Sequence, residues 1–155
     1  MDKTNAMRQL ETAGVKFRVA EYTYQDDFSG EDVAERINLP PEQVFKTLIA
    51  RGAKRGILVF CIPVNCELDL KKAARAAGDK AVEMTHVKEL LGLSGYIRGG
   101  VSPVGMKKKY PTYIDETAVL FDEIAVSAGV RGMQMICDPE GLIAFAEAAE
   151  ADLCV

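Results

Sequence analysis

The sequence predicts a single α+β domain over residues 1–155, with about seven short strands in a curved, barrel-like mixed sheet and helices around it. Three observations support this prediction. The chain has 155 residues, which is the size of one domain. Hydrophobic residues make up 48% and charged residues 27%, as is ordinary for a soluble globular protein. Short strand-like segments are interspersed with helical ones, without an internal repeat or linker.

Helical segments are marked by the spacing of apolar residues and by their capping residues. Thr4 is a plausible N-cap for a helix ending before Gly14, and Gly78 is a plausible end for a helix over 69–77. Three more helices are expected: 31–39, stopped by Pro40 and Pro41; one capped by Thr85 that runs to Gly92; and a last helix over 139–149 with Pro139 at an early position.

Strands are expected where β-branched and aromatic residues gather. The segments 45–50 and 57–62 flank a basic turn and predict a hairpin with a longer loop. Further short strands are expected at 17–22, 80–84, 112–115, 119–121, 124–127 and 133–137.

The charge pattern limits the possible partners. A net charge of −4 argues against loose nucleic-acid binding, so we expect no DNA partner. Three basic clusters nevertheless stand out, namely Arg51-Lys54-Arg55, Lys71-Lys72-Arg75 and Lys107-Lys108-Lys109. Each could be a solvated surface, or the clusters could converge on a phosphate-binding face; the sequence leaves both interpretations open.

The absence of targeting, membrane-spanning and metal-binding patterns gives expectations about cellular location and cofactors. The N-terminus lacks a basic segment followed by an apolar run, and the longest apolar run, 56–63, is too short to span a bilayer. We therefore expect a cytoplasmic protein without a membrane partner. The four cysteines form no CxxC pair and His86 is remote from them, so we expect free thiols, no metal and no cofactor.

The sequence offers no conventional catalytic motif. It lacks a G-x-S-x-G elbow, a P-loop and an H-E-x-x-H helix. Its one histidine, His86, stands at a predicted helix start, where a surface role is favoured. A hydrolase built on this chain would therefore not use a standard triad.

Three stretches could carry chemistry. Lys46 lies on a strand with two largely apolar faces, so its ammonium must either reach solvent or meet an anion. The glycine-rich segment 98–105 could bring backbone N–H groups close to a ligand, and 127–132 combines a hydroxyl with an arginine. Plain hairpin turns would explain the last two stretches equally well.

Taken together and in order, these stretches resemble the YbaK/EbsC family of aminoacyl-tRNA deacylases. The motifs are Phe45-Lys46-Thr47-Leu48, Leu68-Asp69-Leu70-Lys71-Lys72, the run Gly99-Gly100-Val101-Ser102-Pro103-Val104-Gly105-Met106-Lys107-Lys108, and Ser127-x-Gly129-x-Arg131-Gly132. The resemblance covers nearly the whole chain and implies the mixed, barrel-like fold that is shared with the editing domain of bacterial prolyl-tRNA synthetases.

The resemblance also implies site residues. Lys46 would hold the tRNA end, and Gly99 and Gly100 would supply backbone contacts beside the scissile ester. The substrate pocket would further include Tyr22, Phe28, Val101, Ser102, Pro103, Ser127, Gly129, Arg131 and Gln134. Gln134 departs from the family, which often has an aspartate there; a neutral amide can hydrogen-bond but cannot act as a carboxylate.

The implied activity is removal of cysteine from mischarged Cys-tRNA(Pro), with Cys-tRNA(Cys) as a second candidate substrate and prolyl-tRNA synthetase as a candidate partner. The substrate's own thiol would attack its ester carbonyl and release the tRNA, which converts the cysteinyl group to a cyclic thiolactone, so no protein nucleophile is needed. Two alternatives stay open: a deacylase for another charged tRNA such as Ala-tRNA(Pro), and a non-catalytic module that binds tRNA or a synthetase.

Overall fold

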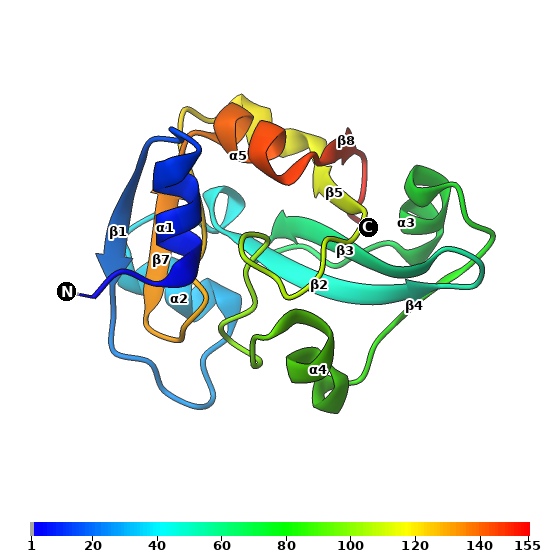
Figure 1. Ribbon diagram of the computed structural model, residues 1–155, viewed down its shortest axis with the longest axis horizontal. Helices are drawn as coiled ribbons and strands as arrows, with labels where there is room; N and C mark the ends of the chain where they lie inside the picture. The colour runs from blue at the N-terminus through cyan, green and yellow to red at the C-terminus, as the bar shows by residue number, and fades with distance from the viewer. Residues whose placement is uncertain (1) are drawn as a thin grey trace.

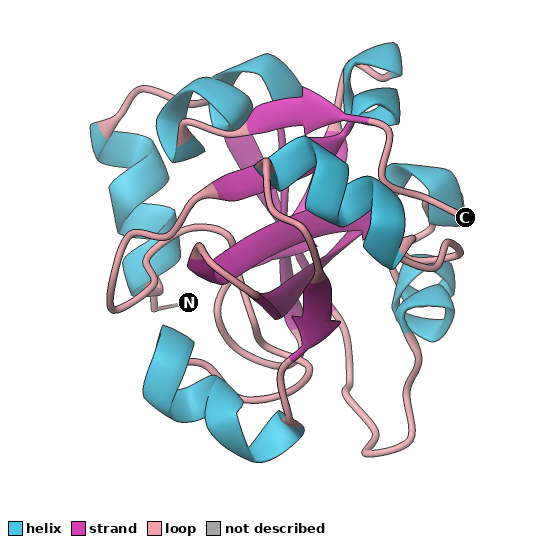
Figure 2. Ribbon diagram, turned by 90° about the vertical axis from the view of Figure 1, so that its right-hand side faces the viewer, coloured by secondary structure: helices cyan, strands magenta, loops and turns pink. Residues whose placement is uncertain are grey.

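The computed structural model describes residues 2–155, with strands in the middle of the molecule and helices around them (Figures 1 and 2). In chain order the elements are α1 (Asn5–Thr12), β1 (Phe17–Glu21), α2 (Gly30–Arg36), η1 (Pro41–Gln43), β2 (Phe45–Gly52), β3 (Gly56–Pro63), α3 (Leu70–Ala77), β4 (Val82–Met84), η2 (Val87–Glu89), α4 (Leu90–Ser94), β5 (Thr112–Asp115), η3 (Glu116–Leu120), β6 (Ile124–Ser127), β7 (Met133–Cys137), α5 (Pro139–Ala146) and β8 (Ala149–Ala151). Within this part of the chain, no helix combines the length and apolar character needed to cross a membrane.

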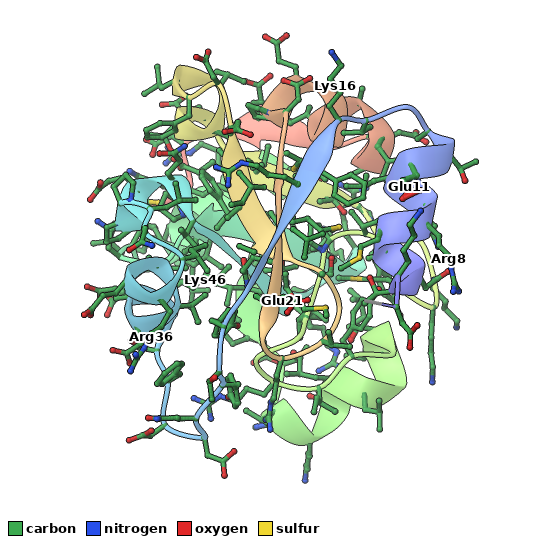
Figure 3. The ribbon with its side chains drawn as sticks, turned by 90° about the vertical axis from the view of Figure 1, so that its left-hand side faces the viewer. Arg8, Glu11, Lys16, Glu21, Arg36 and Lys46 are labelled. Carbon is green, nitrogen blue, oxygen red and sulfur yellow. The ribbon has the colours of Figure 1, made fainter. Side chains whose placement is uncertain are left out.

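The smaller sheet contains three antiparallel strands in the order β1-β7-β6. Gln134 in the central strand faces Ala20 on one side and Ser127 on the other. The helix α1 buries Met7 and Leu10 in the core next to this sheet, while Arg8 and Glu11 point outward (Figure 3). Its apolar face is thus supplied by the helical spacing that the sequence predicts.

The larger sheet has five strands in the order β4-β2-β3-β5-β8. The predicted hairpin of β2 and β3 is confirmed, with antiparallel pairs from Phe45–Pro63 to Gly52–Gly56. β5 runs parallel to β3, and β8 runs parallel to β5. Both faces of the hairpin are covered, because alternate residues enter two different core clusters.

The barrel-like closure expected from the sequence is wrong. The two sheets stay separate, and the isolated β-bridge between them in the described chain joins Val44, just before β2, to Ala125 in β6. On the outer edge of β2, β4 pairs only with the last three residues, Ala50–Gly52. The sheets therefore diverge along the first half of β2 instead of closing around it.

Several local predictions also need correction. The expected strand 119–121 is absent, since residues 116–120 form the 3-10 turn η3, which Asp115 caps through its bond from the Thr117 N–H. The last predicted helix, 139–149, ends earlier, at Ala146, and a short strand that was not predicted, β8, begins at Ala149. Thr85 does not cap a helix; its hydroxyl donates to the Ile49 carbonyl, and His86 precedes η2 instead.

Of the remaining caps, Thr4 and Gly78 were predicted correctly, whereas the helix expected to end at Gly92 continues to Ser94 and is capped by Gly95. The Thr4 hydroxyl accepts the Met7 N–H at the start of α1, and the Asp69 carboxylate accepts the Lys71 and Lys72 N–H groups at the start of α3. Gly78 ends α3 with φ at +68°. These ends were predictable because capping depends on residues that adjoin in the sequence.

Candidate active site

A cavity of about 880 Å³ lies where the two sheets diverge. Its walls come from the outer edge of β2, from the segment 22–30 between β1 and α2, and from the loops that follow α4 and β6. β4 and the start of α4 complete the rim with apolar side chains. The cavity thus collects segments from across the whole chain at one place.

Most of the residues implied by the family resemblance meet in this cavity. Eight of them line it: Tyr22, Phe28, Lys46, Gly99, Val101, Ser127, Arg131 and Gln134. Four others do not line it: Gly100, Ser102, Pro103 and Gly129. The structure therefore brings one set of residues together around a cavity and places a second set in the loops behind it.

The second set shapes the loops. The Gly100 N–H donates to the Ile97 carbonyl, and the buried Ser102 hydroxyl accepts the Val104 N–H. Gly129 has φ at +96°, and a Cβ there would lie 2.9 Å from the Tyr96 ring. Tyr96 in turn donates to the Val104 carbonyl at 2.6 Å. These contacts lock the two loops against each other.

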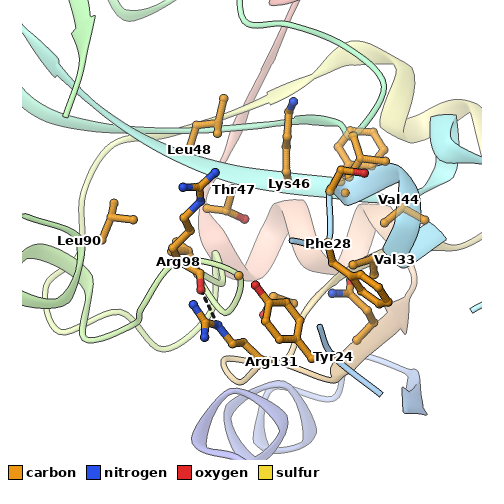
Figure 4. Close-up of a pocket in the computed structure, with 18 of the residues that line it drawn as sticks. Tyr24, Phe28, Val33, Val44, Lys46, Thr47, Leu48, Leu90, Arg98 and Arg131 are labelled. Atoms are coloured by element: carbon orange, nitrogen blue, oxygen red, sulfur yellow. Dashed lines mark hydrogen bonds between the residues drawn. The ribbon is translucent and has the colours of Figure 1, made fainter. Parts of the chain in front are cut away.

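Lys46 is half-buried on β2, and in the described part of the chain its ammonium has no hydrogen-bond or ion-pair partner. Lys46 and Leu48 project to one side of the strand and Thr47 to the other (Figure 4). The cation is thus available to a ligand at the open edge of β2.

Arg131 links the two loops. Its Nε donates to the Arg98 carbonyl at 2.8 Å, and its guanidinium lies over the Tyr24 ring, 4.7 Å from the centroid (Figure 4). Tyr24 meets Phe28 edge-on, and Phe28 stacks with Tyr22. An aromatic wall backed by arginine therefore closes one side of the cavity.

Comparison with known proteins identifies this architecture. The aminoacyl-tRNA editing domain model matches residues 28–145, which include most of the cavity wall. The chain belongs to the aminoacyl-tRNA editing domain family. The resemblance to YbaK/EbsC proteins that the four motifs predicted is thereby confirmed.

Individual relatives of this editing domain agree with the assignment. EbsC of Enterococcus faecalis, named as a candidate Cys-tRNA(Pro)/Cys-tRNA(Cys) deacylase, is 47% identical over 97% of this chain and 93% of its own. The proline–tRNA ligase of Thermosipho africanus is 32% identical over 50% of this chain, which spans only 14% of the ligase. A solved structure described as a candidate trans-editing enzyme for prolyl-tRNA synthetase has 28% identity and a TM-score of 0.84, and each chain is covered to 99%.

Two polar atoms inside the editing domain stand out. The Tyr22 hydroxyl and the Gln134 Oε1 are buried in the cavity wall, and neither has a hydrogen-bond partner among the described residues. Gln134 is only 6% exposed. Since an unpaired buried polar atom costs free energy, both atoms are candidates for contact with a bound ligand.

The editing domain has few protein groups that could act as nucleophile or base. His86 is exposed and does not line the cavity. Cys61, opposite Thr47 on β3, is 2% exposed, and burial raises the pKa of its thiol to about 12. Residues 2–155 contain no cluster of three metal-ligating side chains. The described cavity wall therefore contains cations, hydrogen-bonding groups and the carboxylates of Asp26 and Asp27, but neither a histidine nor a cysteine.

The cavity is also lined by residues that the sequence had not assigned to the site, among them Tyr24, Thr47, Leu90 and Arg98. Tyr24 could have been found, because it alternates with Tyr22 in an extended segment and so adds to the same aromatic group. Arg98 and Leu90 carry no local signal of this kind. Only the packing of α4 beside β2 brings them to the cavity.

Proposed function

We propose that this protein is a cytoplasmic trans-editing deacylase that removes cysteine from Cys-tRNA(Pro). The observation that carries the proposal is a cavity with a free cation, Lys46, and glycine-shaped loops, whose described wall contains neither a histidine nor a cysteine. Such a site suits a substrate that supplies its own nucleophile. The name of EbsC, the 47%-identical relative, points to the same substrates.

In the proposed reaction the cysteine thiol of the substrate attacks its own ester carbonyl. A sulfur–carbon bond forms, the ester carbon–oxygen bond breaks, and the thiol proton passes to the ribose oxygen of the departing tRNA. The product is a cyclic thiolactone. The protein accelerates this step by holding thiol and carbonyl in contact and by stabilising the oxyanion.

Particular residues take defined roles. Lys46 holds the tRNA end near the departing oxygen. Gly99 and Val101, whose N–H groups donate to no other described residue, supply backbone contacts beside the ester, while the Gly100 N–H is already bonded to Ile97. Serine would be a poor substrate, because a hydroxyl ionises far less readily than a thiol.

The partner proposed for this reaction is prolyl-tRNA synthetase, in a ternary complex with the charged tRNA. Two observations support it. Relatives include regions of proline–tRNA ligases, of which this chain spans 14% and 18%. Several surface cations are engaged within the protein, as in the Arg51–Glu89 and Lys72–Asp152 pairs, which leaves fewer for tRNA alone.

The first test is deacylation of Cys-, Ala- and Pro-tRNA(Pro) by wild type, Lys46→Ala and a matched control, Lys16→Ala, which removes an exposed lysine outside the cavity. We expect cysteine to be released fastest, and Lys46→Ala to lower that rate on the order of 10²-fold or more, because the cation acts on the departing group. Lys16→Ala should match wild type.

Each of the other outcomes contradicts one part of the proposal or supports a different function. Full activity of Lys46→Ala contradicts the role given to this residue. Faster release of alanine than of cysteine replaces the substrate by Ala-tRNA(Pro). If the wild-type protein binds tRNA without releasing the amino acid, the alternative function as a non-catalytic tRNA-binding module is supported.

A further inference from the structure

The outer edge of β2 contains a gap in its strand pairing. β4 pairs with Ala50–Gly52 at one end, and β6 touches the strand at Val44, just before it begins. Between these points, no described strand pairs with residues 46–48 on this side. The cavity opens onto this stretch, since Lys46, Thr47 and Leu48 all line it.

The orientation of the peptide groups in the gap follows from neighbouring hydrogen bonds. The Val64 N–H donates to the Val44 carbonyl, so even-numbered residues face β3. The Thr85 N–H donates to the Ile49 carbonyl, so odd-numbered residues face outward. Because peptide groups alternate along a strand, the N–H and C=O of Thr47 both point into the cavity. Neither is bonded to another residue of the described chain.

A single unpaired residue at a sheet edge matches one chemical partner closely. It offers a donor and an acceptor side by side, as any exposed edge strand does. In an antiparallel sheet, two facing residues exchange both N–H···O=C bonds. An aminoacyl ester carries the complementary set, because its α-amino N–H and its ester carbonyl are separated by one Cα.

We propose that the aminoacyl group of the substrate adds to β2 as a strand of one residue. The Thr47 N–H donates to the ester carbonyl oxygen, and the Thr47 carbonyl accepts from the α-amino group. This inference rests on the proposed deacylase function and identifies how that site binds the aminoacyl group of its substrate. The Thr47 N–H is then a catalytic group, because its bond strengthens as the carbonyl oxygen becomes an oxyanion.

Antiparallel polarity fixes the rest of the substrate. Along β2 the Thr47 N–H lies on the Lys46 side and its C=O on the Leu48 side. The ester and the departing ribose oxygen therefore lie toward Lys46, and the amine lies toward Leu48. The amino-acid side chain falls on the face that Thr47 shares with Phe45 and Ile49, opposite Lys46 (Figure 4). The proposed antiparallel arrangement therefore explains why a lysine stands at position 46, on the side of the departing ribose oxygen.

The decisive experiment replaces one peptide N–H by an ester oxygen. α-Hydroxyisovalerate is introduced at position 47, and its activity is compared with that of Thr47→Val, which has the same side chain and keeps the N–H. The matched control is the same ester at Val19 on β1. Its N–H points away from β7, because the neighbouring even-numbered residues bond to that side, as the Tyr22 N–H does to Gly132.

We expect kcat on Cys-tRNA(Pro) to be on the order of 10²-fold lower for the ester at position 47 than for Thr47→Val. The ester at Val19 should stay within about twofold of wild type. Equal effects at the two positions overturn the inference while wild-type activity still supports the deacylase. Absence of wild-type turnover overturns both together.

A substrate analogue tests the second bond without changing the protein, so it also decides the matter where the ester variant does not fold. 3-Mercaptopropionyl-tRNA(Pro) retains the thiol and the ester but lacks the α-amino group. Wild type should show a KM about fivefold to tenfold higher for this analogue, which corresponds to the loss of one hydrogen bond. An unchanged KM contradicts the bond to the Thr47 carbonyl.

Discussion

At the residue scale, Gln134 and Tyr22 hold polar atoms in the cavity wall at the expense of stability. Gln134 lies on the central strand of the three-stranded sheet, between Ala20 and Ser127, and its side chain is buried. Its unpaired carbonyl oxygen is expected to destabilise the ligand-free protein. Sites that sacrifice stability in this way are usually retained for binding.

Gln134→Met tests this trade-off. Methionine has a similar length and no unpaired carbonyl, so we expect the free energy of unfolding to rise by about 1 kcal/mol and the melting temperature by roughly 2–4 °C. The kcat/KM for deacylation should fall. The control is Gln43→Met, which loses the bond from the Gln43 amide to the Glu123 carbonyl at 2.7 Å and should melt lower. A Gln134→Met protein that also melts lower would contradict the account.

At the scale of elements, the loop after α4 depends on glycine at a position that faces the cavity. Gly99 has φ at +89°, and a Cβ there would lie 3.0 Å from the Tyr24 hydroxyl and 3.1 Å from the Arg131 Nε. Gly14 has a similar φ of +77°, but a Cβ there would meet nothing within 4 Å. Substitutions at Gly99 and Gly14 therefore distinguish the effect of backbone strain, which both share, from the effect of crowding in the site, which only Gly99 has.

Alanine at either position should cost about 1–2 kcal/mol of unfolding free energy, because both require a left-handed backbone. Only Gly99→Ala should lower kcat/KM, on the order of tenfold to a hundredfold, since it displaces Tyr24 and Arg131. Thermal melts and deacylation rates on the two variants check this. Equal activity in both would show that the loop tolerates the displacement.

The β2–β3 turn is held to the end of α3 by one carboxylate. Asp79 accepts the N–H groups of Arg55, Lys54 and Lys80, at 2.8 Å for Arg55. The bond from Arg55 is the main cause that lowers the pKa of Asp79 below its ordinary value of 3.8. This turn carries one of the basic clusters, and its backbone is organised by an acid.

The lowered pKa of Asp79 predicts an acid-sensitive contribution to stability. Since its pKa is lower in the folded state, the stabilisation is complete above about pH 4 to 5 and is lost as the pH falls through the folded-state value. Asp79→Asn should therefore melt below wild type at pH 7, and the gap should narrow toward pH 2. The exposed Asp122 accepts no hydrogen bond within residues 2–155, so Asp122→Asn serves as the charge-matched control. A gap that is constant with pH would contradict the assignment.

At the scale of the whole molecule, the basic clusters do not form one free phosphate-binding face. Arg51 pairs with Glu89 at 2.8 Å, Lys72 pairs with Asp152 at 3.0 Å, and Lys109 pairs with Glu147. Arg55 donates to the Ala77 carbonyl and to the Tyr113 hydroxyl. Each cluster thus has at least one cation engaged within the protein.

We therefore expect weak, only mildly salt-dependent binding of uncharged tRNA by the isolated protein. A plot of the logarithm of the association constant against that of salt concentration should have a slope no steeper than about −3, which corresponds to roughly three or four phosphate contacts. Glu89→Gln releases Arg51 and should steepen the slope by about one if this cluster faces tRNA. A wild-type slope beyond about −6 would contradict the need for a partner.

Local signals in the sequence predicted much of the fold. The β2–β3 hairpin and the caps of α1 and α3 depend on neighbouring residues, and they were correct. The strand expected at 119–121 was wrong, because its apolar residues serve a turn in which Leu120 is 77% exposed. β8 was missed because Ala149-Glu150-Ala151 has no strand character of its own; pairing with β5 makes it a strand.

The sequence by itself determined the α+β class, most element positions and, through ordered motifs, the editing-domain family. Only the tertiary structure decided that the sheets stay open, that eight of the expected site residues share one cavity, and that the Thr47 peptide group faces it. The physical reason is the separation along the sequence over which the deciding interactions act. Periodicity and capping act within a few residues, whereas the gap beside β2 depends on where β4 and β6 stop pairing, and those strands lie about 35 and 80 residues further along the chain.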